Sequence, residues 1–389
     1  MLGQGELLLK SIVVLLLTIL LISWMLKRFS QPYFSAYILA GILLGPHGLG
    51  LFTNIETIAQ IGSLGLIMQM FFIGAEIEPN SLLKNLRTSV IGILVQLTLS
   101  LVFVAIIGYH LTWSIDRIIL FGFIISLSSS AIILEYLNKN GEMHFRLGQL
   151  TTGILLVQDF LLVPMIMVLN FLAKGETSFS ELLLGCITTF LFFWLLRKIV
   201  LEKKVQLPGL HKLQPDHELQ VFIGLLICFG FAWITSVMNL SAAMGAMFAG
   251  MLISQTDSMK WFDQSLIPFR VFFISFFFLS IGLQLNFDFI QQNFSLIVIL
   301  VLLIFCTNSL INALAFRLLK ESWKNSVYAG ALLSQIGEFS LVLCVIARDL
   351  NLVDNFSYQL TLAVISLTML LSSGWITIIR AFLFTTNKK

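Results

Sequence analysis

Apolar segments, each about as long as a bilayer is thick, follow one another along almost the whole chain. About 20 apolar residues form a helix that crosses the hydrocarbon core of a membrane, and a helix satisfies its own backbone polar groups there. Only 11% of the residues are charged, against about 25% in a soluble domain. The pattern predicts an all-α polytopic membrane protein with about thirteen spans, at 6–26, 33–51, 57–75, 88–109, 116–137, 147–173, 180–199, 219–237, 240–255, 266–285, 293–317, 325–347 and 357–381.

The distribution of Lys and Arg predicts the orientation. If the N-terminus is outside, 19 of the 23 Lys and Arg residues fall in cytoplasmic loops and ends, as the positive-inside rule requires. We therefore expect a multi-pass protein of the cell membrane with a cytoplasmic C-terminus. The net charge of +3 gives no reason to expect nucleic acid as a partner. The four cysteines lie singly in apolar runs without metal-ligand spacing, so no cofactor is expected.

A basic hydrophilic connection divides a single transmembrane domain, 1–389, into two sets of spans. We predict six spans plus a linker helix over 6–199, a cytoplasmic loop over 200–218, a second set over 219–381 and a short tail over 382–389. The linker helix adds one crossing, so the second set starts on the opposite side of the membrane. This is the topology of inverted six-helix repeats, with which many secondary transporters are built.

Polar residues interrupt the fifth and the twelfth predicted span near mid-depth. The fifth contains a cluster of serines at 126–130, and the twelfth contains Ser334, Gln335, Gly337 and Glu338. Interruptions at corresponding positions of two halves are typical of discontinuous helices at a transporter's site. The alternative is that these small and polar residues join neighbouring helices.

Asp159 is the only charged residue of 147–173, and it lies near the middle of that segment, after Gln158. A carboxylate at that depth costs at least ~2.5 kcal/mol on insertion scales and is by default an ion or proton site. The alternative is an aspartate that is hydrogen-bonded inside the bundle as a packing device.

Five segments resemble the monovalent cation:proton antiporter-2 family, in particular the membrane part of the glutathione-gated potassium efflux antiporters. The Gln-Asp pair in its apolar setting is the most specific of them, and the order of the segments is kept. They are AGILLGPHGLGLF at 40–52, SLSSSAIILEYLNKNGEM at 126–143, LLVQDFLLVPMIMVL at 155–169, IPFRVFFISFFFLSIGLQL at 267–285 and SQIGEFSLVL at 334–343.

The resemblance implies a sodium/hydrogen-exchanger-like fold in a homodimer, with a dimerisation domain and a mobile core domain that moves like an elevator. Two discontinuous helices would cross beside the ion-binding carboxylate. Asp159 would bind either a monovalent cation or a proton. Gln158 would supply an amide oxygen, and Ser128, Ser129 and Ser130 would supply hydroxyl or carbonyl oxygens, which hard cations require.

A carboxylate at the membrane midplane is tolerated when a proton or an alkali cation neutralises it, and is costly when bare. A carrier with such a site crosses readily when loaded and reluctantly when empty, so competition for one site enforces exchange. We therefore predict a secondary active transporter that exchanges a cation for protons by alternating access.

The predicted site has four supporting residues. Asn308 stands where some relatives carry a lysine that pairs with the aspartate, and the absence of that lysine favours electroneutral exchange. Asn308 itself would hydrogen-bond the Asp159 carboxylate or help to coordinate the cation; alternatively, its amide links two helices. Glu338, followed by Phe339 in the Gly-Glu-Phe segment, is a candidate to line the cytoplasmic funnel or cap a half-helix. Arg270 is a candidate partner for Glu338 or Glu135, and Gln335 belongs to the interruption itself.

The Gln-Asp pair resembles the potassium branch of the family, so we predict K⁺ ahead of Na⁺, with a Na⁺/H⁺ antiporter of the same fold as the alternative. No βαβ pattern or G-x-G-x-x-G follows the last span. We therefore expect any regulation to come from a separate cytoplasmic subunit or from the loops.

Two other classes of membrane protein fit the sequence less well. An intramembrane aspartyl protease needs two facing aspartates, and the sequence has no second one at mid-depth and no Gly-x-Gly-Asp; we expect no enzyme. A cation channel remains an alternative, but channels usually form a pore from repeated subunits or carbonyl filters.

Overall fold

The computed structural model describes residues 2–28, 33–52, 55–76, 79–174, 217–237, 242–254 and 260–385, and all regular elements in these ranges are helices. They are α1 (Leu2–Lys27), α2 (Tyr33–Leu44), α3 (Ile55–Glu76), α4 (Pro79–His110), α5 (Ile115–Ser126), α6 (Ser130–Lys139), α7 (Arg146–Lys174), α9 (His217–Val237), α10 (Ala242–Ser254), α11 (Lys260–Leu283), α12 (Phe287–Gln292), α13 (Phe294–Leu318), α14 (Trp323–Leu332), α15 (Glu338–Asp349) and α16 (Asn355–Thr385).

The predicted apolar segments that fall in these ranges all contain a helix or a pair of helices. Within the described part of the chain, eight helical stretches are long and apolar enough to cross a membrane, and two shorter apolar helices accompany them. The segment 180–199, nearly all of the loop 200–218 and the end of the tail lie outside the described residues. The number of thirteen spans and the inverted repeat therefore stay predictions.

Both predicted interruptions are present. The fifth segment breaks between Ser126, where α5 ends, and Ser130, where α6 begins. The twelfth breaks between Leu332, where α14 ends, and Glu338, where α15 begins. Ser129 caps α6, because its side-chain oxygen accepts the backbone N–H of Ile132 at 3.3 Å, a role that serine commonly takes at a helix start.

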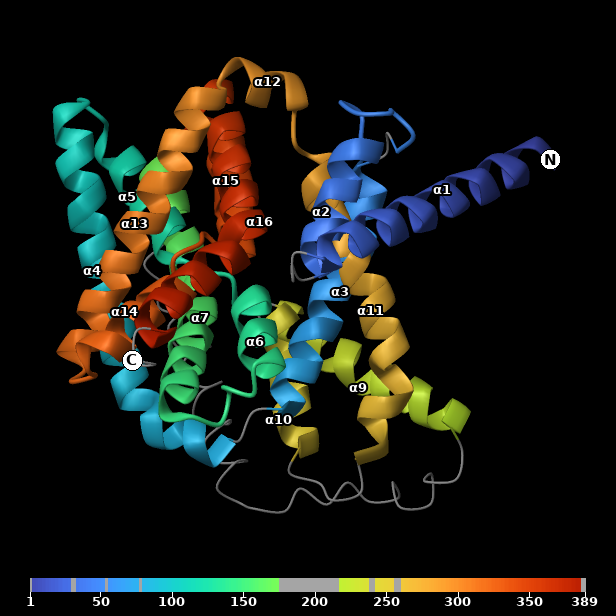
Figure 1. Ribbon diagram of the computed structural model, residues 1–389, viewed down its shortest axis with the longest axis horizontal. Helices are drawn as coiled ribbons and strands as arrows, with labels where there is room; N and C mark the ends of the chain where they lie inside the picture. The colour runs from blue at the N-terminus through green and yellow to red at the C-terminus, as the bar shows by residue number, and fades with distance from the viewer. Residues whose placement is uncertain are drawn as a thin grey trace.

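The helices form two groups that lie side by side (Figure 1). One comprises α1–α3 and α9–α11 and is called here the glycine bundle; the other comprises α4–α7 and α13–α16 and is called the broken-helix bundle. Within each group the helices pack extensively, whereas between the groups the main contacts are those of α6 with α3 and of α16 with α2. The short helix α12 leads from one bundle to the other at the top edge of Figure 1.

The glycine bundle packs backbone against backbone. A Cβ atom at Gly65 of α3 would lie 2.0 Å from the carbonyl oxygen of Phe273 in α11. A Cβ atom at Gly282 of α11 would lie 2.1 Å from the carbonyl oxygen of Ile38 in α2. Small residues let helices approach closely in membranes, where dispersion contacts rather than the hydrophobic effect drive helix association. These glycines therefore fix the spacing of α2, α3 and α11.

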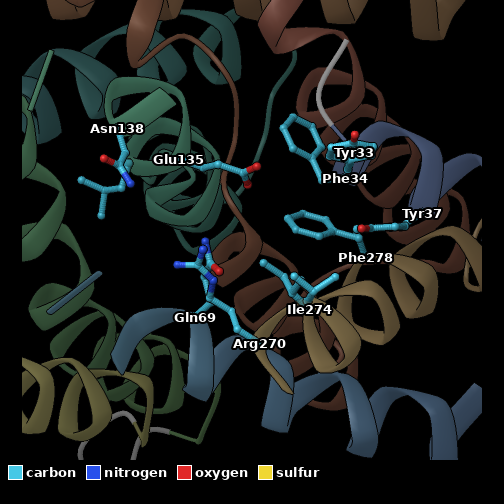
Figure 2. A pocket seen from close by; sticks show the side chains of 11 residues that line it. Tyr33, Phe34, Tyr37, Gln69, Glu135, Asn138, Arg270, Ile274 and Phe278 are labelled. Carbon is cyan, nitrogen blue, oxygen red and sulfur yellow. The ribbon is translucent and has the colours of Figure 1, made fainter. Parts of the chain in front are cut away.

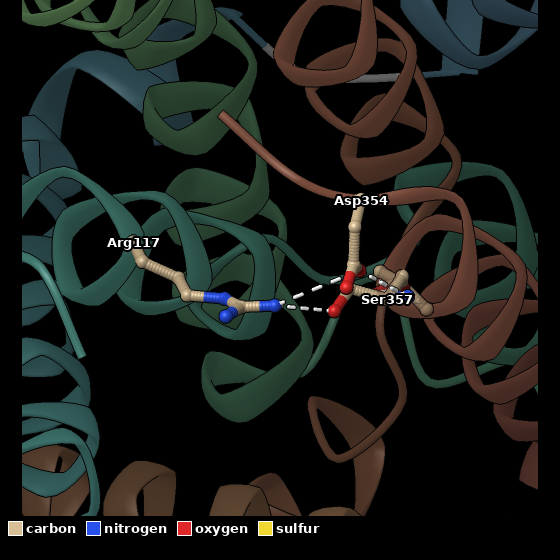
Figure 3. A network of polar contacts seen from close by, with 4 residues as sticks. Arg117, Asp354 and Ser357 are labelled. Atoms are coloured by element: carbon tan, nitrogen blue, oxygen red, sulfur yellow. Dashed lines mark hydrogen bonds and ion pairs between the residues drawn. The ribbon is translucent and has the colours of Figure 1, made fainter. Parts of the chain in front are cut away.

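Polar contacts join the helix ends of the broken-helix bundle. At one end, Arg117 of α5 lies 3.8 Å from the carboxylate of Asp354 and donates a hydrogen bond to the hydroxyl of Ser357 in α16 (Figure 3). Beyond the other end of the broken stretch, Arg380 of α16 lies 2.7 Å from Glu142, which also accepts a 2.7 Å hydrogen bond from Tyr328 of α14. Both ends of the broken α5–α6 stretch are thus tied to α16.

Candidate functional site

The two interruptions cross at Gly337. Its backbone N–H donates to the carbonyl oxygen of Leu127 at 2.8 Å, and the hydroxyl of Ser128 donates to the carbonyl oxygen of Leu333 at 2.9 Å. A Cβ atom at Gly337 would lie 2.5 Å from the carbonyl carbon of Ser128, closer than any real contact. The crossing therefore needs glycine for its lack of a side chain.

Two asparagines one turn apart on α13 bind backbone carbonyls that the interruptions free. The side-chain nitrogen of Asn308 donates to the carbonyl oxygen of Ile125 at 3.0 Å. The side-chain nitrogen of Asn312 donates to the carbonyl oxygen of Leu333 at 3.1 Å. The side-chain nitrogen of Asn308 thus links α13 to α5, and a role of Asn308 in binding the carboxylate or the cation stays a prediction. Asn312 was missed, although its position four residues after Asn308 places it on the same helix face.

Gln158 supports the break between α5 and α6. Its side-chain oxygen accepts the backbone N–H of Ser128 at 3.1 Å, and its side-chain nitrogen donates to Gln96 of α4 at 2.8 Å. Gln96 in turn donates to the carbonyl oxygen of Ser126 at 3.0 Å. Sequence reasoning missed Gln96, a single amide in an apolar run. The oxygen of Gln158 that was expected to face a cation therefore already accepts one hydrogen bond.

Asp159 lies beside the start of α6. Its Oδ1 is 3.4 Å from the hydroxyl oxygen of Ser130, which is also 3.3 Å from Oε1 of Glu338, the first residue of α15. Asp159 is 4% exposed and Glu338 is 3% exposed. Of the three predicted serines, Ser130 is the one whose hydroxyl reaches Asp159, since those of Ser128 and Ser129 bind Leu333 and the backbone of α6. The structure thus brings a second carboxyl group to the site.

The other two supporting residues differ in position. Gln335 is fully buried in the second interruption, and neither of its side-chain polar atoms has a hydrogen-bond partner among the described residues. Arg270 of α11 lies in the glycine bundle, with its guanidinium 4.8 Å from the centre of the Phe72 ring. It forms no ion pair with Glu338 or Glu135 in the part of the chain that the structure describes. Arg270 nevertheless interacts electrostatically with Glu135 at longer range, so of its two candidate partners Glu135 is the one that it faces.

Arg270 and Glu135 both line a cavity of about 300 Å³ between the two bundles. Glu135 of α6 lines it from one side, and Tyr37 and Phe278 line it from the other (Figure 2). The cavity therefore lies between α6 of the broken-helix bundle and α2, α3 and α11 of the glycine bundle.

A family described as "Sodium/hydrogen exchanger, transmembrane" matches residues 13–381. The Iron transporter MagA of Paramagnetospirillum magneticum is 31% identical over 355 residues, which cover 90% of this chain and 81% of that protein. K(+) efflux antiporter 4 of Arabidopsis thaliana is 26% identical over 350 residues, which cover 87% of this chain and 58% of that protein. The glutathione-regulated potassium-efflux system protein KefC of Shigella sonnei is 28% identical over 336 residues, which cover 84% of this chain and 53% of that protein. The chain thus spans little more than half the length of these two potassium relatives.

A solved structure shares the fold. The sodium proton antiporter MjNhaP1 of Methanocaldococcus jannaschii superposes with a TM-score of 0.69 over 97% of this chain and 98% of its own, at 16% identity. The match to the family over nearly the whole chain shows that this multi-pass membrane protein belongs to the sodium/hydrogen exchanger family of monovalent cation:proton antiporters.

Proposed function

We propose that this protein exchanges a monovalent cation for protons, one for one, at Asp159. The observation that carries the proposal is a buried carboxylate beside the crossing of two broken helices. Helices without interruption leave no free backbone groups in a membrane, whereas broken ones are tolerated where they are buried in protein or line a cavity. Such breaks near the midplane are where secondary transporters bind their ions.

Electroneutral exchange is supported by the charges near Asp159. The ion pairs formed among the described residues lie at helix ends, at Arg117, Arg146 and Arg380, and none involves Asp159. At the α13 position where some relatives carry a lysine, Asn308 binds a backbone carbonyl. Because no internal cation competes for Asp159 there, a proton or a monovalent cation each brings the one positive charge that neutralises it.

Oxygen atoms for a cation are available at the crossing. The side-chain oxygens of Gln335 and Asn312 and Oε2 of Glu338 are buried and have no hydrogen-bond partner among the described residues. Buried polar atoms usually have a partner, and alkali cations take oxygen ligands. These atoms therefore extend the predicted ligand set beyond Asp159, Gln158, Ser128, Ser129 and Ser130.

Alternating access is supported by the division into two bundles. The broken-helix bundle carries Asp159 and is tied together at both ends, whereas its contacts with the glycine bundle are few. A rigid group with sparse contacts to its neighbour can move as a unit. In this proposal the broken-helix bundle moves past the glycine bundle, and the glycine bundle forms the contact of a homodimer, as the family resemblance implies.

K⁺ is the proposed cation, and Na⁺ is the alternative. The names of the Arabidopsis and Shigella relatives refer to potassium, and the name of MjNhaP1 refers to sodium. The Gln158–Asp159 pair resembles the potassium branch of the family. The MagA relative is named for iron. The described residues contain no group of three or more His, Cys, Asp or Glu side chains that could hold a metal ion, and this favours an alkali cation.

The test is proton flux in proteoliposomes. A preset pH gradient should collapse on addition of K⁺, more weakly with Na⁺, and Asp159→Asn should abolish this flux without impairing folding. Asp288→Asn, which removes an exposed carboxylate on α12, is the control and should retain it. Flux that survives in Asp159→Asn contradicts the proposal, and large cation currents without coupled proton movement indicate a channel. A pH gradient that collapses faster with Na⁺ than with K⁺ makes sodium the substrate.

A further inference from the structure

We propose that Asp159 and Glu338 act as a pair of carboxyl groups that share one resident proton through the hydroxyl of Ser130, so that only a second proton exchanges against the cation. The inference rests on the proposed function and adds Glu338 and Ser130 to its proton chemistry.

The geometry at Ser130 calls for a proton on one of the carboxyl groups. The hydroxyl oxygen lies 3.4 Å from Oδ1 of Asp159 and 3.3 Å from Oε1 of Glu338. A serine hydroxyl has one proton to donate and can accept others, whereas an ionised carboxylate only accepts. Both contacts are hydrogen bonds only when one carboxyl group is protonated and donates to Ser130. The arrangement is therefore the one expected for two carboxyl groups with at least one proton between them.

The surroundings of Glu338 also favour a resident proton. Its Oε2 is buried and forms no hydrogen bond among the described residues, and its Oε1 lies 3.3 Å from the hydroxyl of Ser130 and 3.5 Å from the backbone nitrogen of Ala131; the hydroxyl of Ser129 also faces this carboxyl group. A buried ionised carboxylate needs strong partners for both oxygens or a paired positive charge. A protonated carboxyl group is neutral, so burying it with one weakly hydrogen-bonded oxygen costs far less free energy than burying an ionised carboxylate in the same place.

Among the described residues, the elements around Glu338 bring no other charge to the pair, and Glu135 of α6 lines the cavity between the bundles. Asp159 of α7 and the hydroxyl groups of Ser129 and Ser130 face Glu338. Tyr358 of α16 faces Arg348 at the far end of α15, and Cys344 is the remaining titratable group within α15. The other titratable groups on α5, α7, α15 and α16 lie at helix ends: Asp116, Arg117, Arg146, Lys174, Asp349 and Arg380.

The charges of the pair then explain neutral exchange. With one monovalent cation bound and both carboxyl groups ionised, the site carries one net negative charge, whereas a resident proton makes it neutral. The two neutral loaded states are a cation with one proton and two protons. In the first, the resident proton moves between the carboxyl groups when Glu338 gives its proton to the oxygen of Ser130 while the hydroxyl proton of Ser130 passes to Asp159. No other reactant is needed, and the reverse transfer restores the first arrangement.

The pH profile of exchange tests the proposal. Wild-type flux should fall at acid pH, where protons occupy Asp159, and at alkaline pH, where the resident proton is lost; two coupled groups give such a bell shape. Glu338→Gln keeps a neutral side chain that can donate to Ser130 and cannot lose a proton, so its alkaline limb should reflect the loss of the proton at Asp159 alone and should be less steep than in wild type by one proton. Glu321→Gln removes a similarly buried carboxyl group outside the site and should keep both limbs.

Other outcomes have distinct meanings. A Glu338→Gln profile whose alkaline limb is as steep as in wild type overturns the inference, and a higher half-saturation for the cation at every pH would instead make Glu338 an ionised ligand. If Glu338→Gln does not fold, Ser130→Ala should lower the exchange rate by about 10-fold or more while Ser130→Thr keeps it, because the relay needs a hydroxyl. An unchanged rate in Ser130→Ala also overturns it. Activity that survives in Asp159→Asn would refute the proposed function itself.

Discussion

The contacts that hold the helices together differ between the glycine bundle and the broken-helix bundle. In the glycine bundle, α2, α3 and α11 approach until backbone touches backbone, as at Gly65 and Gly282. In the broken-helix bundle, side chains donate hydrogen bonds to backbone oxygens that the interruptions free: Ser340 to Ile124 at 2.8 Å, Asn308 to Ile125, Gln96 to Ser126, and Ser128 to Leu333.

The difference follows from the cost of unpaired backbone groups in lipid. A continuous helix satisfies itself, so its neighbours need only shape, and glycine provides the closest fit. A broken helix exposes carbonyl and N–H groups, so its neighbours must carry amides and hydroxyls. The same polar surroundings can receive an ion. The structure therefore separates a bundle built for packing from a bundle built around polar backbone.

Substitution of glycine by alanine should have different effects in the two bundles. The largest effect is expected at Gly337. The added Cβ would lie 2.5 Å from the carbonyl carbon of Ser128, so the two interruptions must move apart. A displacement of about 1 Å can cost a factor of about 100 in rate, and we expect at least that loss of cation-dependent proton flux. Gly230→Ala on α9, where nothing lies within 4 Å of the new atom, is the control. Unimpaired flux in Gly337→Ala would show that the crossing does not set the site.

In the glycine bundle the same change should affect stability rather than the site. At Gly65 the new Cβ would lie 2.0 Å from the carbonyl oxygen of Phe273, and overpacking of this kind typically costs about 1–3 kcal/mol. Thermal unfolding in detergent should show a lower midpoint, while flux per folded molecule at saturating cation keeps its pH profile. A changed profile with an unchanged midpoint would contradict the division of roles.

The smallest effect is expected at Asp354, at the end of the broken-helix bundle. Its Oδ1 accepts the backbone N–H of Ser357 at 2.8 Å at the start of α16, and Arg117 lies nearby. Hydrogen bonds from Ser357, with a smaller contribution from Arg117, lower the pKa of this exposed carboxyl group. Asp354→Asn keeps a capping side chain and removes the charge, so the loss of stability should stay under about 1 kcal/mol.

The pH dependence of that loss has a definite sign. A pKa that is lower in the folded than in the unfolded state stabilises the fold above the unfolded pKa, and this contribution disappears as pH falls through the folded pKa. The difference in unfolding midpoint between wild type and Asp354→Asn should therefore be present at neutral pH and vanish in strong acid. A difference that grows toward acid pH would contradict the assignment.

The local features of the site were predictable from the sequence. Asp159 and Gln158 stand out in an apolar segment, and the serines at 126–130 and the Ser-Gln-Ile-Gly-Glu run predicted both interruptions, which the structure confirms. Gln96 and Asn312 were missed because a single amide in an apolar run has no partner that sequence alone can name. Arg270 was grouped with the site although it lies in the other bundle.

The sequence by itself determined which segments are apolar enough to enter a membrane, where their helices break and which carboxylate is buried, because each of these depends on residues close together in the chain. Only the tertiary structure decided that Glu338, 179 positions after Asp159 in the numbering, meets it at Ser130, that Asn308 binds a backbone carbonyl, and that the helices divide into two bundles. Those contacts join elements far apart in sequence, and they arise because every backbone group freed by a break must find a partner within the bundle.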